Sequence, residues 1–581
     1  MQTTNQYTTP LMQKLQSEKK SAKEFVERRY EDWNENYELF RNKVKTNRLT
    51  QRQNVNIPLM KETIKTLLSK VDDAPGVEWK DLGGDSLKEL MFQEIWNDNY
   101  DRLNLEGVDI QDKKTVLLYG RAFKKLNWAD NKIDIRALDI FDITIDPLTD
   151  PLNLETARFI IQSNIFRSLR EILADERYET EGKDQLKIWL TSPEGIIQSS
   201  KDKEMWEAKL VRLKAMGVDS AEFPLFAGGD TIVNITEHYT NIWNEKKKKF
   251  ERKVIVYAND SIELLNDTLK NLMGVEFYPF VTWAEDIETQ DFWSDSVADL
   301  IRTPNKVINI WFSQLVENRT IRNFQMHWYD ATVEGYSPQT YEPGAGRMLP
   351  APGDPNKTIM PVNIQGLDET LTAINFITTI VERASSVTAI EKGQSQTGQQ
   401  TLGEIQVLVG KAQERTITMA KAYHRSWLEI CQKYQAIMNA NATTKMELYK
   451  KGRDGKMWPK VIYPSDWRSE RGFKALVVST SEQEENSLKN IQKFQFVLQQ
   501  FPNNSALRII AQKRMLETID LTPEEMREVQ DAEEEALKMQ QSMQQMQLQQ
   551  GMAPEGLQGS PQQGAVPSPL QQPLTPQGAQ A

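Results

Sequence analysis

The chain has 581 residues, of which 39% are apolar, and it contains 14 Trp residues. This length allows three or four domain-sized units with buried cores, and the composition excludes a chain that is disordered throughout. The formal net charge is -11, which argues against tight electrostatic binding of nucleic acid, because the phosphate backbone is also negative.

The single cysteine, Cys431, lies in an apolar helical pattern. Disulfides and cysteine-rich zinc sites are therefore excluded, and we expect a buried, unreactive thiol. The N-terminus lacks a basic region followed by an apolar run, and no stretch approaches the roughly 18 apolar residues of a membrane span. We expect neither a signal peptide nor a membrane span, and synthesis in the cytoplasm.

The first part of the chain mixes helical and strand patterns. Residues 9–70 predict two amphipathic helices, and Ser86 to Asn104 predict a third with Leu87 and Leu90 on its apolar face. Short strands are predicted at Thr115–Tyr119, Ala122–Leu126, Ile133–Leu138 and Arg158–Gln162.

Residues 139–151 predict a strand that ends in two Asp-Pro turns, and a helix is predicted from Ser168 to Arg177. Residues 201–229 resemble an insertion, and their pattern predicts no definite element. Alternation on both sides of the lysine run 246–249 predicts a β-hairpin over Thr231–Ile262. A lysine run of this kind is more typical of a solvated turn than of a nucleic-acid contact.

A strand at Phe277–Trp283 precedes a long amphipathic helix that reaches about Asn323, with Ser294 or Asp295 as candidate caps. About thirty residues at 1.5 Å each correspond to a rod of roughly 45 Å. Pro304 interrupts this pattern, and a kink or a local helix start is expected there because proline removes a backbone donor.

Residues 324–365 are rich in Pro and Gly and predict turns and short strands. The helical period returns from Leu367, which predicts a second helix that runs back along the first. Residues 391–401 contain no apolar side chain, so they predict a mobile polar loop. A third helix is predicted from Leu402 to Leu428.

After this helix, residues 445–449, 460–463 and 475–478 predict short strands that return to an α+β body. Residues 482–534 are predicted to be helical. From Gln549 to Ala581 the composition is dominated by Gln, Gly and Pro, which predicts disorder.

Few residues suggest catalysis. The sequence contains no P-loop, and His238, His327 and His424 do not have the spacing of metal ligands. Four carboxylates are the strongest candidates, because clustered carboxylates can hold Mg²⁺ for phosphodiester hydrolysis. They are Asp139, Asp142, Asp146 and Asp150. Asp-Pro pairs are also ordinary turn formers, and we favour this structural interpretation.

The arrangement over residues 15–530 resembles the portal proteins of tailed bacteriophages, which form the ring at one capsid vertex. The most specific pieces are Thr115-Val-Leu-Leu-Tyr-Gly-Arg121, the strand and turn around Phe141-Asp142 and Asp146-Pro147, Tyr278-Pro-Phe280, and Asp291-Phe-Trp-Ser-Asp-Ser-Val-Ala-Asp-Leu300. The last piece is similar to a portal pattern in which a strand and a turn precede a helix that carries an asparagine, here Asn305 or Asn309.

This resemblance implies an α+β subunit with an α/β wing, a two-helix stem, a small β-containing clip, a helical crown and a disordered tail. The implied parts are a wing at 1–290, stem helix 1 at 291–323, a clip at 324–365, stem helix 2 at 366–388, a tunnel loop at 389–402, a long helix and the second part of the wing at 403–480, a crown at 481–540 and a tail at 541–581.

The resemblance also implies a dodecameric ring that is not an enzyme, has no cofactor and no membrane contact, and serves as the conduit for DNA packaging and ejection in the virion. The implied partners are the large terminase subunit, head–tail adaptor proteins, the major capsid and scaffolding proteins, and double-stranded DNA. As hypotheses, the residues that face DNA are Lys392, Gln394, Gln396, Gln399 and Gln400, and those of the clip that contact terminase or adaptor are Tyr329, Tyr336, Tyr341 and Arg347.

Two alternatives remain open. One is another virion connector, although such chains are usually shorter and lack two helices separated by an insert. The other is a metal-dependent nuclease or other DNA-processing enzyme that uses Asp142 and Asp146. Mg²⁺-dependent cleavage that Asp146→Asn abolishes would favour the nuclease.

Overall fold

The computed structural model describes a large part of the chain. The described residues are 9–43, 55–70, 75–129, 131–216, 230–323, 327–329, 354, 359–361, 364–385, 387, 402–451 and 457–478, and some side chains, among them those of 402–417, are not described. The chain divides into two units, Met1–Gln483 and Glu484–Ala581. The second unit, with the expected crown and tail, lies outside the described residues, so the description concerns the first unit.

Four helices form the beginning of this unit. They are α1 (Pro10–Phe40), α2 (Leu59–Lys70), α3 (Ser86–Arg102) and α4 (Leu105–Tyr119). The predicted helices within 9–70 and at 86–104 are confirmed. The predicted apolar face of α3 is partly wrong: Phe92 and Trp96 are buried, whereas Leu87 and Leu90 are 61% and 55% exposed.

The predicted strand at Thr115–Tyr119 is wrong, because these residues form the end of α4. A short apolar run cannot by its period alone be assigned to a strand or to a buried helix. Here Leu105 and Val108 extend the buried face by two turns towards the N-terminus, which makes a helix. Gly120 ends α4 in the left-handed conformation, with φ of 87°, and a strand begins directly after it.

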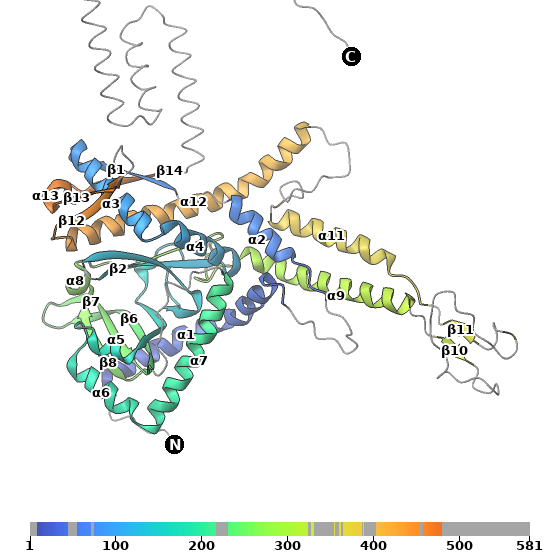
Figure 1. Cartoon of the computed structure of the whole chain (residues 1–581), viewed down its shortest axis with the longest axis horizontal. Helices are drawn as coiled ribbons and strands as arrows, with labels where there is room; N and C mark the ends of the chain where they lie inside the picture. The colour runs from blue at the N-terminus through green and yellow to red at the C-terminus, as the bar shows by residue number, and fades with distance from the viewer. Residues whose placement is uncertain are drawn as a thin grey trace, which may run out of the picture. The chain divides into compact units, whose positions relative to one another are not determined.

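Two antiparallel sheets form the body (Figure 1). The first has the order β3-β2-β9, with β2 (Arg121–Ala129), β3 (Lys132–Leu138) and β9 (Phe280–Ala284). The second has the order β4-β5-β6-β7-β8, with β4 (Ile143–Ile145), β5 (Phe159–Ser168), β6 (Ile232–Asn244), β7 (Lys249–Ala258) and β8 (Ile262–Thr268). The predicted strands at 122–126, 133–138 and 158–162 and the predicted hairpin are confirmed.

In the described part of the chain, six helices lie between or next to the strands of the second sheet in sequence order. They are η1 (Ile140–Asp142), η2 (Leu154–Thr156), α5 (Leu169–Ala174), α6 (Thr180–Leu190), α7 (Pro193–Met216) and α8 (Leu269–Met273). A reciprocal capping box between Ser168 and Glu171 starts α5, close to the predicted helix. Helix α7 occupies the first part of the 201–229 segment, and 217–229 lie outside the described residues.

Helix α9 (Val297–Asn323) runs through Pro304 without a break, so no new helix starts there. Its 27 residues correspond to about 40 Å. Helix α11 (Asp368–Ser385) runs back along α9, as expected (Figure 1). Between them, β10 (His327–Tyr329) pairs with β11 (Ile359–Pro361), which agrees with the short strands expected in the Pro/Gly-rich segment.

Helix α12 (Leu402–Asn441) is longer than predicted and leads into β12 (Met446–Lys451), β13 (Met457–Ile462), α13 (Pro464–Trp467) and β14 (Phe473–Val478). Strands β12 and β13 form a hairpin. Strand β14 pairs with β1 (Gly76–Asp81), which the sequence did not predict. The end of the described chain thereby returns to its beginning, as expected for a chain that rejoins its α+β body.

A single main core joins these parts. It contains Trp79 from β1, Trp293 from the segment before α9 and Tyr434 from α12, all at most 2% exposed. The described residues are thus a mixed helix-and-sheet structure, which confirms the α+β class. No helix in the described ranges is both long and apolar enough to cross a bilayer.

Candidate functional site

Helix α9 begins at a reciprocal pair of side chains. The N–H of Asp299 donates to Ser296 Oγ over 3.1 Å, and the N–H of Ser296 donates to Asp299 Oδ2 over 2.8 Å. This arrangement satisfies two backbone donors at the helix start, as a capping box does. The predicted caps, Ser294 and Asp295, are one or two residues too early.

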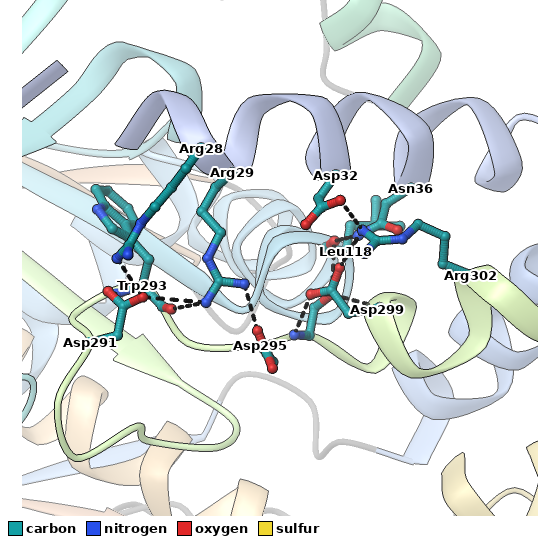
Figure 2. A network of polar contacts seen from close by, with 11 residues as sticks. Arg28, Arg29, Asp32, Asn36, Leu118, Asp291, Trp293, Asp295, Asp299 and Arg302 are labelled. Atoms are coloured by element: carbon teal, nitrogen blue, oxygen red, sulfur yellow. Dashed lines mark hydrogen bonds and ion pairs between the residues drawn. The ribbon is translucent and has the colours of Figure 1, made fainter. Parts of the chain in front are cut away.

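The N-terminus of α9 contacts α1 and α4 at one carbonyl group. The C=O of Leu118, in the last turn of α4, accepts hydrogen bonds from Asn36 Nδ2 of α1 and from Ser296 Oγ (Figure 2). Asn36 also donates to Asp299 Oδ1 over 2.9 Å. Carbonyls in the last turn of a helix lack partners within that helix. Here the side chains of Asn36 and Ser296 supply the missing partners, and they thereby fix three helices to each other.

Close packing surrounds this point. Gly120 follows α4 directly, and a Cβ atom there would overlap the backbone of Ser294. Trp293, next to Ser294, is 1% exposed and meets Trp33 of α1 edge to face, with ring centroids 5.5 Å apart. Offset and edge-to-face aromatic pairs add about 0.5–1.5 kcal/mol beyond their buried area. The segment before α9 is therefore held by packing as well as by hydrogen bonds.

Two arginines of α1 bind the acidic segment before α9 (Figure 2). Arg28 pairs with Asp291 over 2.6 Å, and Arg29 pairs with Asp295 over 2.5 Å and donates to the C=O of Trp293 over 2.7 Å. Burial lowers the pKa of Arg29, but the hydrogen bond and charge of Asp295, with the charges of Asp291 and Asp299, outweigh this effect and raise the pKa. Arg29 therefore remains a permanent cation at the centre of this contact.

A second set of ion pairs continues along α9. Arg302 contacts Asp32 of α1 over 3.0 Å and Asp299 over 2.9 Å, and Lys306 contacts Glu35 of α1 over 2.9 Å. Single exposed ion pairs contribute little, but a network with shared partners and fixed geometry contributes more. These contacts align the first two turns of α9 with α1.

Helix α9 also contacts the start of α2 and the extended segment that precedes it. Three buried polar side chains of α9, spaced four residues apart on one helix face, accept hydrogen bonds from this backbone. Asn305, Asn309 and Ser313 accept from the N–H groups of Met60, Ile57 and Val55, over 3.0, 2.7 and 3.0 Å. Both asparagines that the portal pattern suggested are therefore structural, since each satisfies a backbone donor.

Helix α12 is fixed to the sheet by a buried lysine. Lys433, 6% exposed, donates to the carbonyls of Tyr278 and Phe280 over 2.9 and 2.7 Å and pairs with Glu155 over 2.9 Å. The Tyr278-Pro-Phe280 motif thus provides the carbonyl groups that hold α12. Its role could not be predicted from the sequence, because it depends on a cation about 150 residues away.

Buried charges lie beneath the same helix. Asp112 of α4 accepts hydrogen bonds from Lys124 of β2 and from the indole N–H of Trp283 of β9, and all three side chains are at most 5% exposed. Burial raises the pKa of Asp112, although Lys124 and Trp283 oppose the effect. Asp109, one turn away, accepts from the indole N–H of Trp427 of α12.

The sequence-predicted site residues are not brought together by the described part of the chain. The DNA-channel candidates Lys392, Gln394, Gln396, Gln399 and Gln400 lie outside the described residues, as do Tyr336, Tyr341 and Arg347. Tyr329 ends β10, and its side chain is not described. Helices α11 and α12 flank the predicted loop, which thus remains a prediction about the segment between them.

The candidate metal-binding carboxylates are occupied by other partners. Asp146 accepts two hydrogen bonds from the Arg158 guanidinium over 2.6 Å, Asp142 pairs with Lys209, and Asp139 pairs with Arg212. Asp150 accepts from the N–H of Leu152 in a turn. Asp142 also lies in η1 and precedes β4, so the expected common strand face of Asp142 and Asp146 is wrong.

The pKa values of these two carboxyl groups differ. Burial raises the pKa of Asp142 to about 6, with Lys209 opposing this and Asp139 adding to it. Burial also raises the pKa of Asp146, but the hydrogen bonds from Arg158 and Leu148 outweigh it and hold the pKa below its ordinary value. Among the described residues, no three or more His, Cys, Asp or Glu gather as a metal site would require.

The remaining candidates are structural where they are described. His238 is buried and shares a hydrogen bond with Glu18 of α1 over 2.9 Å, and burial lowers its pKa. The thiol of Cys431 is buried on α12, which confirms the prediction, and burial raises its pKa. Arg29, Asn36 and Lys433, which connect elements distant in the chain, carry no signal in the sequence, because their partners are remote backbone and carboxylate groups.

Polar contacts hold the N-terminal part of α9 to α1 and α4, and they hold α12 to the carbonyls of Tyr278 and Phe280. Segments outside the described residues follow α9 and precede α12. Neither a family model nor a curated protein matches this chain.

Proposed function

We propose that this chain is the subunit of a phage portal, a ring at one capsid vertex that conducts DNA during packaging and ejection. The large terminase subunit and head–tail adaptors are the proposed docking partners, and the major capsid and scaffolding proteins surround the ring. In this proposal α9 and α11 form the stem, and residues 389–402 form a loop that meets DNA.

The pairing of β1 with β14 carries the proposal. Residues 76–81 and 473–478 lie side by side, so the segment from α9 to α12 leaves a closed α+β body and returns to it. An excursion of two antiparallel helices with a small paired-strand module between them is the subunit plan that the sequence resemblance implies. Other virion connectors are usually shorter and lack two helices separated by an insert.

The anchoring of the helices supports the same role. Stem helices of a conduit must keep their position while DNA moves past them. Contacts with α1, with α4 and with the segment before α2 hold the N-terminal part of α9. The acidic chain, with a net charge of -11, suits weak contact with a sliding polyanion.

The contacts of the carboxylates favour a conduit over a nuclease. A metal-dependent nuclease needs carboxylate oxygens that are accessible to a cation. The carboxylates of Asp142 and Asp146 instead face Lys209 and Arg158.

Electron microscopy of the purified full-length chain tests the proposal. Negative-stain images are expected to contain end-on rings with a central hole, and the mass in solution is expected to equal about twelve subunits. A chain that remains monomeric at micromolar concentration, or that cleaves DNA with Mg²⁺ and loses this activity in Asp146→Asn, would contradict it.

A further inference from the structure

The tip of the β6–β7 hairpin extends beyond its neighbouring strands. Strand β5 pairs with β6 as far as Thr240, the N–H of Asn241 donates to the C=O of Arg158, and β8 pairs with β7 only from Lys253. Residues 242–252 therefore form a two-stranded ribbon beyond the neighbouring strands. The turn is well defined: Asn244 Oδ1 accepts from the N–H groups of Lys246 and Lys247 over 3.0 and 3.2 Å. The lysines are therefore presented on an ordered turn.

Two large aromatic side chains are exposed on this ribbon. Trp243 and Phe250 face each other across the strands, with ring centroids 5.1 Å apart, and they are 46% and 68% exposed. The two rings meet edge to face. A solvent-facing aromatic pair beside a charged turn has the composition of an interaction surface, where aromatic residues supply apolar area at low entropic cost.

A broad hollow lies beside the tip. Its volume is about 1470 Å³, and its walls come from α1, β5, β6, β7 and α8. It exceeds the usual size of a small-molecule site. Six of the lining side chains are cationic and three are glutamates, so the hollow has a positive balance. The hollow therefore suits a negatively charged segment of another macromolecule.

The cations of this region fall into two groups. Lys247 pairs with Glu251, Lys270 with Glu276 and Arg252 with Glu155, so these charges are already compensated. By contrast, Lys246, Lys248 and Lys249 are exposed, and none of them forms a close ion pair with a carboxylate among the residues that the structure describes. Hydrogen bonds from Lys247 and Lys270 lower the pKa values of Glu251 and Glu276, and the charge of Lys249 adds to this effect at longer range. Lys246, Lys248 and Lys249, with the aromatic pair, are called the basic tip below.

The same chain carries a surface of opposite charge. In the loop between β9 and α9, Asp286 and Glu288 are exposed and have no cationic partner within the described ranges. Between them, Ile287 is 38% exposed. This acidic loop therefore has the charge and apolar pattern that complements the basic tip.

The two surfaces lie at different places along α1. Lys14 of α1 lines the hollow beside the basic tip, whereas Arg28 of α1 binds Asp291, which follows Glu288 in the same loop. Lys14 and Arg28 are fourteen helical residues apart, about 21 Å along the helix axis. A contact between the two surfaces of neighbouring copies is thus heterologous, and such contacts generate closed rings or open helices.

We propose that the basic tip docks on the acidic loop of a second copy of this chain. Lys246 and Lys249 pair with Asp286 and Glu288 of the next subunit, and Ile287 packs against Phe250. This inference rests on the proposed ring. It deepens that proposal by assigning the charged contact that joins each subunit to the next.

A nucleic acid is the less favoured occupant. A phosphate backbone presents uniform negative charge, whereas the hollow alternates lysines with Glu18, Glu251 and Glu276. The mixed pattern fits a protein surface better.

Charge reversal tests the contact in the full-length chain. Lys246→Glu/Lys249→Glu and Asp286→Lys/Glu288→Lys are each expected to raise the concentration for half-maximal assembly about tenfold or more, since like charges then face each other. The chain with all four substitutions should recover to within about threefold of wild type. Lys201→Glu/Lys203→Glu, which changes the same charge on the exposed side of α7, is the matched control and should leave assembly unchanged.

Light scattering measures assembly, and thermal unfolding confirms that each variant folds. Rings that form equally well in all variants overturn this inference and leave the portal proposal intact, whereas a monomeric wild type overturns both. Loss of assembly in both double variants without recovery in the fourfold variant also overturns the pairing. If only binding of a fluorescent single-stranded 20-mer DNA responds to Lys246→Glu/Lys249→Glu, the tip is a nucleic-acid contact and the inference fails.

Discussion

A Cβ atom on Gly120 would lie 2.0 Å from the carbonyl oxygen of Ser294. Both partners in this contact are backbone, so neither can move aside as a flexible side chain would. Because Gly120 also has φ of 87°, it meets two requirements at once: the left-handed end of α4 and the close approach of the segment before α9.

Gly120→Ala is therefore expected to lower the free energy of unfolding by on the order of 3 kcal/mol or more. Gly84→Ala is the matched control, because Gly84 has φ of 80° but nothing within 4 Å of its added Cβ. That variant should lose only about 1 kcal/mol, the cost of the backbone conformation. Urea unfolding, monitored by Trp fluorescence, measures the free energy of unfolding of both variants. Equal losses in the two variants would exclude the steric contact with Ser294.

Asn309→Ala removes the acceptor for the N–H of Ile57 in a buried position. We expect a loss of about 1–3 kcal/mol in unfolding free energy, because the partly buried N–H of Ile57 loses its acceptor. Asn318→Ala, on the exposed part of the same helix, removes a hydrogen bond to the C=O of Gln365 and should cost at most about 0.5 kcal/mol. A similar loss of stability in the two variants would mean that the N–H of Ile57 finds water or another acceptor when Asn309 is replaced.

Asp142 is expected to make stability depend on pH. Its pKa is raised to about 6 in the folded chain, chiefly by burial, against about 3.9 in an unfolded chain. Between these values the folded chain binds a proton that the unfolded chain releases, so the free energy of unfolding falls as pH rises from about 4 to 6. Lys209 and Arg212 reduce this effect, and Asp139 increases it.

The measurement compares wild type with Asp142→Asn, which cannot titrate at this position. The stability of wild type relative to this variant should fall through the same pH window. A flat difference would show that Lys209 keeps the carboxyl group of Asp142 ionised throughout.

Lys124→Met leaves the carboxylate of Asp112 buried without its cation. A loss of about 3–5 kcal/mol is expected, and Asp112→Asn/Lys124→Met should lose less than the sum of the single variants. Lys132→Met, at an exposed position at the start of β3, is the control and should change stability by at most about 0.5 kcal/mol. Thermal unfolding distinguishes these cases; additive single effects would argue against a direct Asp112–Lys124 pair.

Deletion of residues 391–401 tests the proposed tunnel loop. Rings should still assemble, because the anchors of α9 and α12 lie elsewhere, but DNA packaging or retention should be impaired. Virions filled with DNA at wild-type levels would remove the loop from the mechanism.

Periodicity predicted the elements whose pattern is long. The β6–β7 hairpin follows from two alternating runs around a lysine turn, and α9 and α11 follow from a sustained helical period. The predicted strand at Thr115–Tyr119 is wrong, because a run of four apolar residues, Val116–Tyr119, fits a strand or a buried helix turn equally well. Strand β1 was missed since its partner, β14, is remote in sequence.

The side-chain contacts at the N-terminus of α9 could not be predicted, for a different reason. An arginine on an amphipathic helix has many possible partners, and only the fold brings Arg29 to Asp295 and Asn36 to the C=O of Leu118. Asn309 was suggested by a family pattern, but its acceptor role towards Ile57 required the structure. The hypothetical DNA-contact residues at 391–401 remain predictions, because they lie outside the described residues.

The pairing of β1 with β14 also has a consequence for synthesis of the chain. Gly76 and Val478 are partners, so β1 leaves the ribosome about 400 residues before its neighbour. At 5–20 residues per second it has an unpaired edge for roughly 20–80 s. Unpaired strand edges recruit other strands, so nascent chains on one polysome could pair wrongly through β1. Slow translation or truncation before residue 473 should therefore increase aggregation, and a chaperone that covers this edge should improve the yield of folded chain.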